Sequence, residues 1–116
     1  MSYEEHMGAV QAAITKIDDV QGVIATIRTS CEQVNAAVNT LREICQETTG
    51  LVVNAVGESP NNENAANALT WINQLGNEKA EEVDKRVHAL RGDKMDELAR
   101  QASNIQEALT QYQAVL

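Results

Sequence analysis

The chain has 116 residues, with 9 Lys and Arg against 17 Asp and Glu, a net charge of −8 and no Phe. This length fits one domain, and the negative charge argues against nucleic-acid binding, because a protein needs a cationic surface to displace counterions from phosphate. No apolar run approaches the ~18 residues of a membrane span.

Residues 3–56 are predicted to form the first of two long helices. Ser2, followed three residues later by Glu5, fits a capping box at the start of a helix. Strict alternation of apolar and polar residues, which is typical of strands, is not sustained anywhere. The apolar residues instead recur at steps of three and four, with a mean near the coiled-coil heptad, at Met7, Val10, Ile14, Ile17, Val20, Ile24, Ile27, Cys31, Val34, Val38, Leu41, Cys45, Val52 and Ala55.

A turn is predicted at residues 57–62, which contain the only proline of the chain. Gly, Pro, Ser and Asn each favour turns, and here they occur together. The segments on either side are nearly equal in length, which indicates two antiparallel arms. The sequence therefore predicts an all-α fold, a helical hairpin that forms a single domain over residues 1–116.

Residues 63–116 are predicted to form the second arm. Its apolar positions are Leu69, Ile72, Leu75, Val83, Val87, Leu90, Leu98, Ala102, Ile105, Leu109, Tyr112 and Leu116. The middle of this pattern is weaker, because Lys79 and Lys94 fall near positions that should face the other arm. We expect one long helix that is locally distorted or broken near Gly76 and Gly92. The alternative is two or three shorter helices.

The apolar stripe of the first arm is wider than one partner helix requires. Adjacent apolar residues occur at 23–24, 37–38, 44–45 and 51–53, and a wide stripe is typical of a helix with more than one neighbour. We therefore expect a homodimer or a heterodimer that pairs into a four-helix bundle. The alternative is that small Ala and Val side chains are tolerated at a solvated edge. The candidate partner-binding residues are Val23, Ala37, Ile44, Leu51, Val53, Trp71 and Tyr112.

Trp71 is the single tryptophan of the chain and lies beside the apolar position Ile72. One interpretation is an aromatic plug at the end of the bundle. The other is an anchor for a partner, since Trp is over-represented at interface hot spots.

No motif in the sequence predicts catalysis, a metal site or a cofactor site. Cys31 and Cys45 lie 14 residues apart, about 21 Å along one helix, which is too far for a disulfide; we expect them to be buried and apolar in character. His6 and His88 are isolated from other metal ligands or nucleophiles. Glycine-rich phosphate loops and nucleophile elbows are absent from the sequence. The chain is therefore predicted not to be an enzyme.

A short acidic helical hairpin with a Trp soon after the central turn resembles the Trp-x-Gly family of small proteins secreted by type VII (ESX) systems. Asn73 stands where that family has Gly, and Tyr112 is followed by Leu116 where the family's secretion signal has an acid. The resemblance implies a hairpin that dimerises into a four-helix bundle and serves as a secreted partner or targeting chaperone for a larger effector.

Three functions remain open from the sequence. The first is a non-catalytic helical interaction module of the type VII kind. The second is a structural component of a phage virion or another large particle, and the third is a cytosolic adaptor or regulator. The first residues lack the basic start and apolar stretch of a cleaved signal peptide, so we expect a cytoplasmic protein, or one exported without such a peptide.

Overall fold

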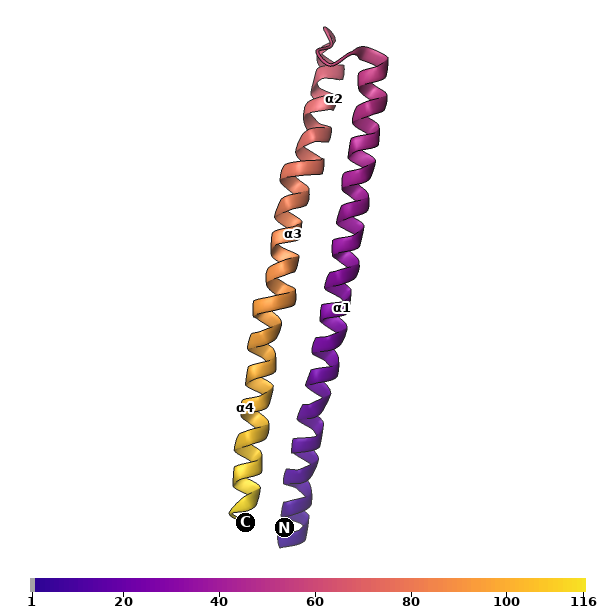
Figure 1. The fold of residues 1–116 in the computed structure, drawn as a ribbon. Coiled ribbons are helices and arrows are strands. Elements are labelled where there is room, and N and C mark those ends of the chain that lie inside the picture. The colour runs from indigo at the N-terminus through magenta and orange to yellow at the C-terminus, as the bar shows by residue number, and fades with distance from the viewer. Residues whose placement is uncertain (1) are drawn as a thin grey trace. The chain divides into compact units, whose positions relative to one another are not determined.

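Residues 2–116 are described by a computed structural model, and every regular element among them is helical (Figure 1). The elements are α1 (Tyr3–Val56), α2 (Glu63–Gln74), the π-helical segment η1 (Leu75–Lys79), α3 (Ala80–Ala89), the π-helical segment η2 (Leu90–Lys94) and α4 (Met95–Ala114). The predicted all-α class is therefore confirmed.

The chain divides into two compact units, which are described here one at a time. Unit 2 spans Cys31–His88 and is a helical hairpin, because the chain reverses after α1 and returns along it as α2 and α3. Unit 1 consists of the described residues through Ser30 together with Ala89–Leu116. In unit 1 the first half of α1 lies beside α4, which runs in the opposite direction (Figure 1).

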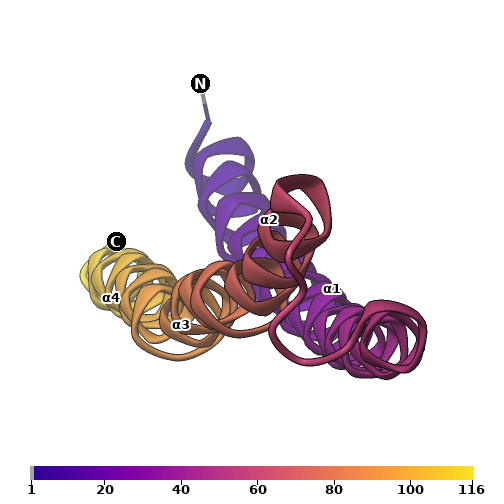
Figure 2. The same ribbon diagram turned by 90° about the horizontal axis from the view of Figure 1, so that it is seen from above.

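The turn of unit 2 covers the residues expected from the sequence, and two caps define it. Gly57 has φ +86°, a left-handed conformation that glycine adopts without steric cost. Its N–H donates to the carbonyl of Val53 (2.8 Å) and ends α1. The side chain of Asn62 accepts a hydrogen bond from the N–H of Ala65 (3.1 Å) and starts α2. Figure 2 shows from above how this short segment joins the two helices.

The second arm is distorted but not broken at Gly76 and Gly92, so the alternative of shorter, separate helices is wrong. Both glycines lie in π-helical turns, which contain more residues per turn than the α-helix. The extra residue advances the contact positions by one. Lys79 and Lys94, which the pattern placed near the contact line, are exposed, and the residues that follow them, Ala80 and Met95, are buried.

The buried core is small and made of small side chains. α1 contributes residues mostly seven apart, and the second arm contributes smaller side chains and one methionine. The buried apolar residues are Val10, Ile24, Cys31, Val38, Cys45, Ala80, Met95 and Ala102. Both cysteines are buried and free, as predicted.

In α4 the predicted contact line is wrong at three positions. Leu98, Ile105 and Tyr112 remain 44–46% exposed. The residues that face α1 with Met95, Ala102 and Leu109 are instead half-buried ones, Ala99, Gln106 and Gln113. The π-helical turns, which advance the contact positions by one residue, account for this shift. Two of the residues that take these places also form hydrogen bonds with α1. Gln106 Nε2 donates to Asp18 Oδ1 (2.5 Å), and Gln113 Nε2 donates to Gln11 Oε1 (3.0 Å).

Candidate functional site

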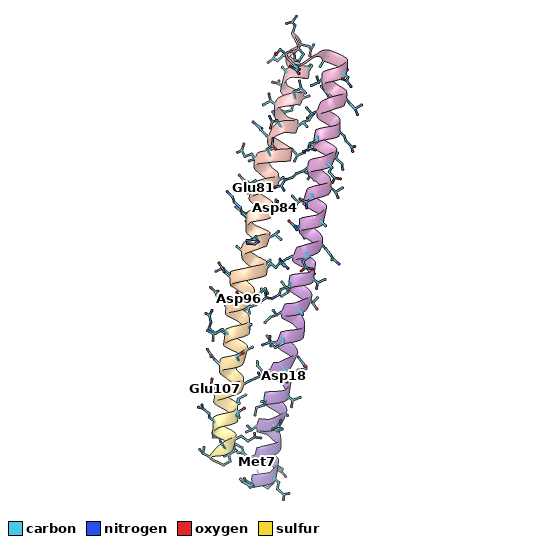
Figure 3. All side chains as sticks on the ribbon, viewed as in Figure 1. Met7, Asp18, Glu81, Asp84, Asp96 and Glu107 are labelled. Carbon is cyan, nitrogen blue, oxygen red and sulfur yellow. The ribbon has the colours of Figure 1, made fainter. Side chains whose placement is uncertain are left out.

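Ion pairs and hydrogen bonds follow one edge of the helix pair in each unit. In unit 1, Arg28 Nη2 lies 2.9 Å from Asp96 Oδ1, on the same edge of α4 as Gln106. In unit 2, Arg42 reaches Asp84 Oδ2 at 2.7 Å and Glu81 Oε2 at 3.2 Å. Figure 3 labels the acidic partners of these contacts, Asp18, Glu81, Asp84 and Asp96, on their helices.

A different surface of unit 1 is apolar and open. A groove of about 560 Å³ runs between α1 and α4. Its walls are mostly aliphatic, and Lys16 and Asp19, which form an ion pair with each other (3.3 Å), stand among them. The aliphatic lining residues are Ala13, Ile17, Val20, Val23, Ile105 and Leu109.

The groove continues along α4 as a second line of heptad-spaced residues. These residues are exposed and follow one another at steps of three and four. We call them the outer seam: Leu98, Gln101, Ile105, Ala108, Tyr112 and Val115. At about 100° per residue, the outer seam is turned roughly 100° around the helix from the residues that face α1. Every residue of the outer seam is exposed in the part of the chain that the structure describes.

Tyr112 of the outer seam contacts His6 of α1. Its hydroxyl oxygen lies 2.7 Å from His6 Nε2, and the two rings meet edge to face with centroids 5.7 Å apart. Tyr112 is nevertheless 45% exposed. Tyr112 and Val23, two of the predicted partner-binding residues, thus both lie in unit 1 and both leave apolar surface accessible.

The other predicted partner-binding residues lie in unit 2. Ala37, Ile44 and Leu51 follow one another at seven-residue steps on α1 and are exposed, Ile44 at 56% and Leu51 at 71%. Trp71 on α2 is 64% exposed. Trp71 therefore packs little within unit 2, and its role as an anchor for a partner stays a prediction. Val53 is half-buried and does not belong to this exposed series.

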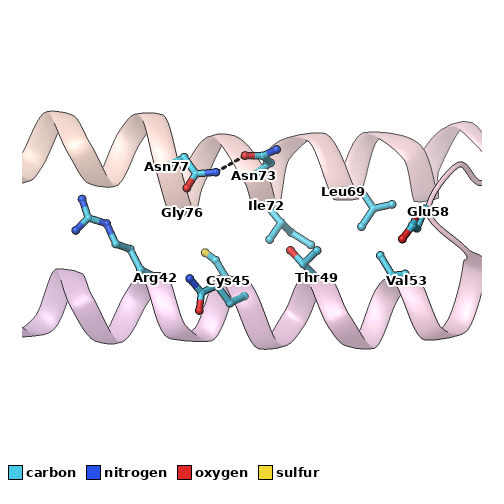
Figure 4. A pocket seen from close by; sticks show the side chains of 11 residues that line it. Arg42, Cys45, Thr49, Val53, Glu58, Leu69, Ile72, Asn73, Gly76 and Asn77 are labelled. Atoms are coloured by element: carbon cyan, nitrogen blue, oxygen red, sulfur yellow. Dashed lines mark hydrogen bonds between the residues drawn. The ribbon is translucent and has the colours of Figure 1, made fainter.

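Val53 instead lines a hollow of about 470 Å³ in unit 2, between α1 and the second arm (Figure 4). The hollow is mixed in character, with Cys45, Ile72 and Gly76 in its wall and polar residues beside them. Asn77 donates a hydrogen bond to Asn73 at its margin. Its one cation, Arg42, is already paired with two acidic side chains. The lining includes no histidine, so it offers the Cys45 thiol no imidazole base.

Residues 2–116 offer neither a cluster of metal ligands nor a helix that could span a membrane. Nowhere in this range do three or more His, Cys, Asp or Glu side chains gather so that they could hold a metal ion. In the same range, each helix is too short or too polar to cross a bilayer.

Comparison of the chain with protein-family models, with curated proteins and with solved structures finds no match.

The sequence analysis missed most of the outer seam, because it assigned Leu98 and Ile105 to the internal contact. One signal for the correct assignment was present. Ala108 and Val115 follow Ile105 and Tyr112 at three-residue steps, so α4 has apolar residues on two adjacent lines. The pattern alone does not distinguish which line faces α1. The one-residue shift at the π-helical turns places Ala99, Gln106 and Gln113 on the side of α4 that faces α1.

Proposed function

We propose that this chain is a non-catalytic helical interaction module that binds a helical protein partner along the apolar face of unit 1. The observation that carries the proposal is the outer seam of α4, a heptad-spaced apolar line that borders an aliphatic groove. Contiguous exposed apolar surface on a small protein marks an association site. The helical spacing specifies the shape of the partner, since a groove between two helices accepts the apolar face of another helix.

The energetic support comes from the large side chains of this face. Fully burying a Leu or Ile side chain contributes roughly 1.5–3 kcal/mol. Leu98 and Ile105 still expose nearly half of their surface to solvent. A partner helix that covered them would therefore gain a substantial part of this free energy at each residue.

A type VII secretion role is part of this proposal and rests on the resemblance alone. An acidic hairpin with an exposed Trp71 after its turn supports it, and Asn73 and Leu116 depart from the family's motifs. The corresponding test is export: the chain should accumulate in culture medium only when the secretion ATPase is active. Retention in cells with an active system would overturn the secretion role and leave the interaction module intact.

The test of the interaction module is site-specific photo-cross-linking in the cells that produce the protein. A photoreactive amino acid at Ile105 should form an adduct with a protein. The matched control is Thr110, which is exposed on α4 and projects from the opposite side of the helix from the outer seam. Adducts at position 105 and none at 110 would support the proposal. Equal yields at both positions, or none at either, would overturn it.

A further inference from the structure

The hollow of unit 2 occupies one edge of its helix pair and thereby identifies the opposite edge. Cys45 of α1 and Gly76 of η1 face each other across the pair, because both are buried and a Cβ added to the glycine would touch the cysteine. Gln46 and Asn77, one residue later on each helix, line the hollow. At about 100° per residue, the residues one position before this contact project toward the other edge.

Four large apolar side chains lie on that other edge and are open to solvent. Ile44 and Leu51 of α1 are 56% and 71% exposed, and Trp71 of α2 and Leu75 of η1 are 64% and 47% exposed. The helices run antiparallel, and the contact described above sets their register. Leu51 therefore lies at about the height of Trp71, and Ile44 at about the height of Leu75. We call these four residues the Trp face.

Acidic residues border the Trp face on both helices. Glu47 lies three residues after Ile44 and four before Leu51, on the same side of α1. Glu78 follows Leu75 by three residues, on the same side of the second arm. Both glutamates are exposed, and neither forms an ion pair within residues 2–116. The apolar surface is thus flanked by negative charge that the chain itself does not neutralise.

The surrounding sequence supplies no cation to this end of unit 2. Residues 43–78 contain no Lys or Arg, and their acidic residues are Glu43, Glu47, Glu58, Glu63 and Glu78. Arg42, just before this segment, already pairs with Glu81 and Asp84. Lys79 stands at the other limit. The potential around the Trp face is therefore negative, which attracts a cationic partner.

We propose that the Trp face binds an amphipathic helix of a partner protein in which Lys or Arg residues flank the apolar line. The apolar side chains of such a helix would cover Leu51 and Trp71, in the way that a helix lies along the groove between two others. Its cations would meet Glu47 on one side and Glu78 on the other. The indole of Trp71 adds a ring face that cations favour and a side chain enriched at interface hot spots. The Trp face shares no residue with the outer seam, so this inference stands or falls independently of the proposed function.

Charge disfavours the other occupants of an exposed apolar face. A second copy that docked with the same face would bring two sets of Glu47 and Glu78 together, and opposed like charges weaken an interface. Nucleic acids and anionic bilayers carry the same sign of charge as this surface. An uncharged helix would cover the aliphatic side chains but leave both glutamates without a counter-charge, and its affinity would not depend on salt.

The first experiment uses Trp71, the single tryptophan of the chain, as its reporter. The full chain is titrated with a synthetic helical peptide of leucine and lysine that has its leucines on one face, and with a control peptide that has glutamate in place of lysine. The lysine peptide should shift the Trp71 emission to shorter wavelength, because it covers the indole. Its affinity should fall at least about tenfold between low and physiological salt. No shift with this peptide, an equal shift with the control peptide, or a salt-independent affinity overturns the inference.

The second experiment separates the Trp face from the overall negative charge of the chain. Glu47→Gln combined with Glu78→Gln should weaken binding of the lysine peptide about tenfold. Glu4→Gln combined with Glu5→Gln removes the same charge from exposed positions of unit 1, and should change the affinity by no more than about twofold. Equal losses in the two double variants overturn the assignment of the site.

The third experiment tests the apolar part of the same surface. Ile44→Ser should weaken binding of the lysine peptide about tenfold, because the partner can no longer bury that side chain. Val23→Ser is the matched control in unit 1, since Val23 is 58% exposed and Ile44 is 56% exposed. Both variants should keep the helical circular dichroism of the wild type. A loss of affinity in Val23→Ser as large as in Ile44→Ser places the peptide elsewhere and refutes the Trp face.

Discussion

Gly76 of η1 lies so close to Cys45 of α1 that a Cβ atom added to the glycine would be 2.8 Å from the Cβ of the cysteine. Contacts this short do not occur between real side chains without movement of one of them. The absence of a side chain at Gly76 therefore lets the two helices of unit 2 approach at the π-helical segment. The glycine that the sequence analysis considered as a possible break is in fact a packing residue.

Gly76→Ala should destabilise the protein despite the better helix propensity of alanine. The propensity gain is about 1 kcal/mol, whereas forcing an extra carbon into a packed contact costs about 1–3 kcal/mol. We expect a net loss of about 1 kcal/mol, measured as a lower midpoint in urea unfolding followed by circular dichroism.

Gly92→Ala is the matched control for this prediction. Gly92 also lies in a π-helical segment, but an added Cβ meets nothing within 4 Å. Its stability should be unchanged or raised by up to about 1 kcal/mol. Gly76→Ala should cost less in a Cys45→Gly background than in the wild-type chain, because the opposing Cβ is absent there. A Gly76→Ala protein as stable as Gly92→Ala would contradict the close approach.

Val38→Asp and Val34→Asp should differ sharply, although both lie on α1 of unit 2. Val38 is 7% exposed and Val34 is 42% exposed. A carboxylate at position 38 would be buried without a partner, which costs several kcal/mol of folding free energy. Because the core is small, we expect this cost to exceed the stability of the fold. We expect Val38→Asp to lose most of its helical signal at 25 °C. Val34→Asp should remain folded with a modestly lower melting temperature, and equal effects would refute the assignment of the core.

Arg42→Met should destabilise unit 2 by about 1–2 kcal/mol. Arg42 pairs with Asp84, whose side chain is 20% exposed, and with Glu81. Removing the cation leaves Asp84 half-buried with no opposite charge, and charged hydrogen bonds contribute about 1.5–3 kcal/mol when solvent is partly excluded. High salt should reduce the difference from wild type in thermal melts.

Lys16→Met provides the comparison for the ion pair of Arg42. Lys16 and Asp19 are paired at 3.3 Å, but their side chains are 84% and 67% exposed. Exposed pairs contribute about 0–1 kcal/mol, so this variant should melt near the wild-type temperature. If both variants lose the same stability, the burial of Asp84 is not the source of the effect.

The two cysteines should react at different rates with a small alkylating reagent. Cys31 and Cys45 are both buried, so both should react slowly in the native protein and rapidly in denaturant. Cys45 lines the hollow of unit 2, which gives iodoacetamide a route to its sulfur. Mass spectrometry of partly labelled protein should find Cys45 modified first, and preferential labelling of Cys31 would contradict the open hollow.

The all-α fold and its turn were predictable because they depend on local chemistry. Gly57 and Asn62 stop and start helices through their own backbone and side-chain preferences, whatever lies nearby. Heptad spacing over residues 3–56 likewise requires no knowledge of the rest of the molecule. The burial of Val10, Ile24 and Val38 followed from that spacing.

The tertiary structure alone decided which apolar line of α4 faces α1. Leu98, Ile105 and Tyr112 were equally good candidates by pattern, since a helix with apolar residues on two adjacent lines can present either. The π-helical turns, which the pattern does not record, advance the second arm by one residue. Met95 is buried as a result, and Gln106 takes the place expected for Ile105. The outer seam is exposed as a consequence. It lies about a right angle around α4 from the residues that face α1, and one helix cannot present both lines to the same neighbour.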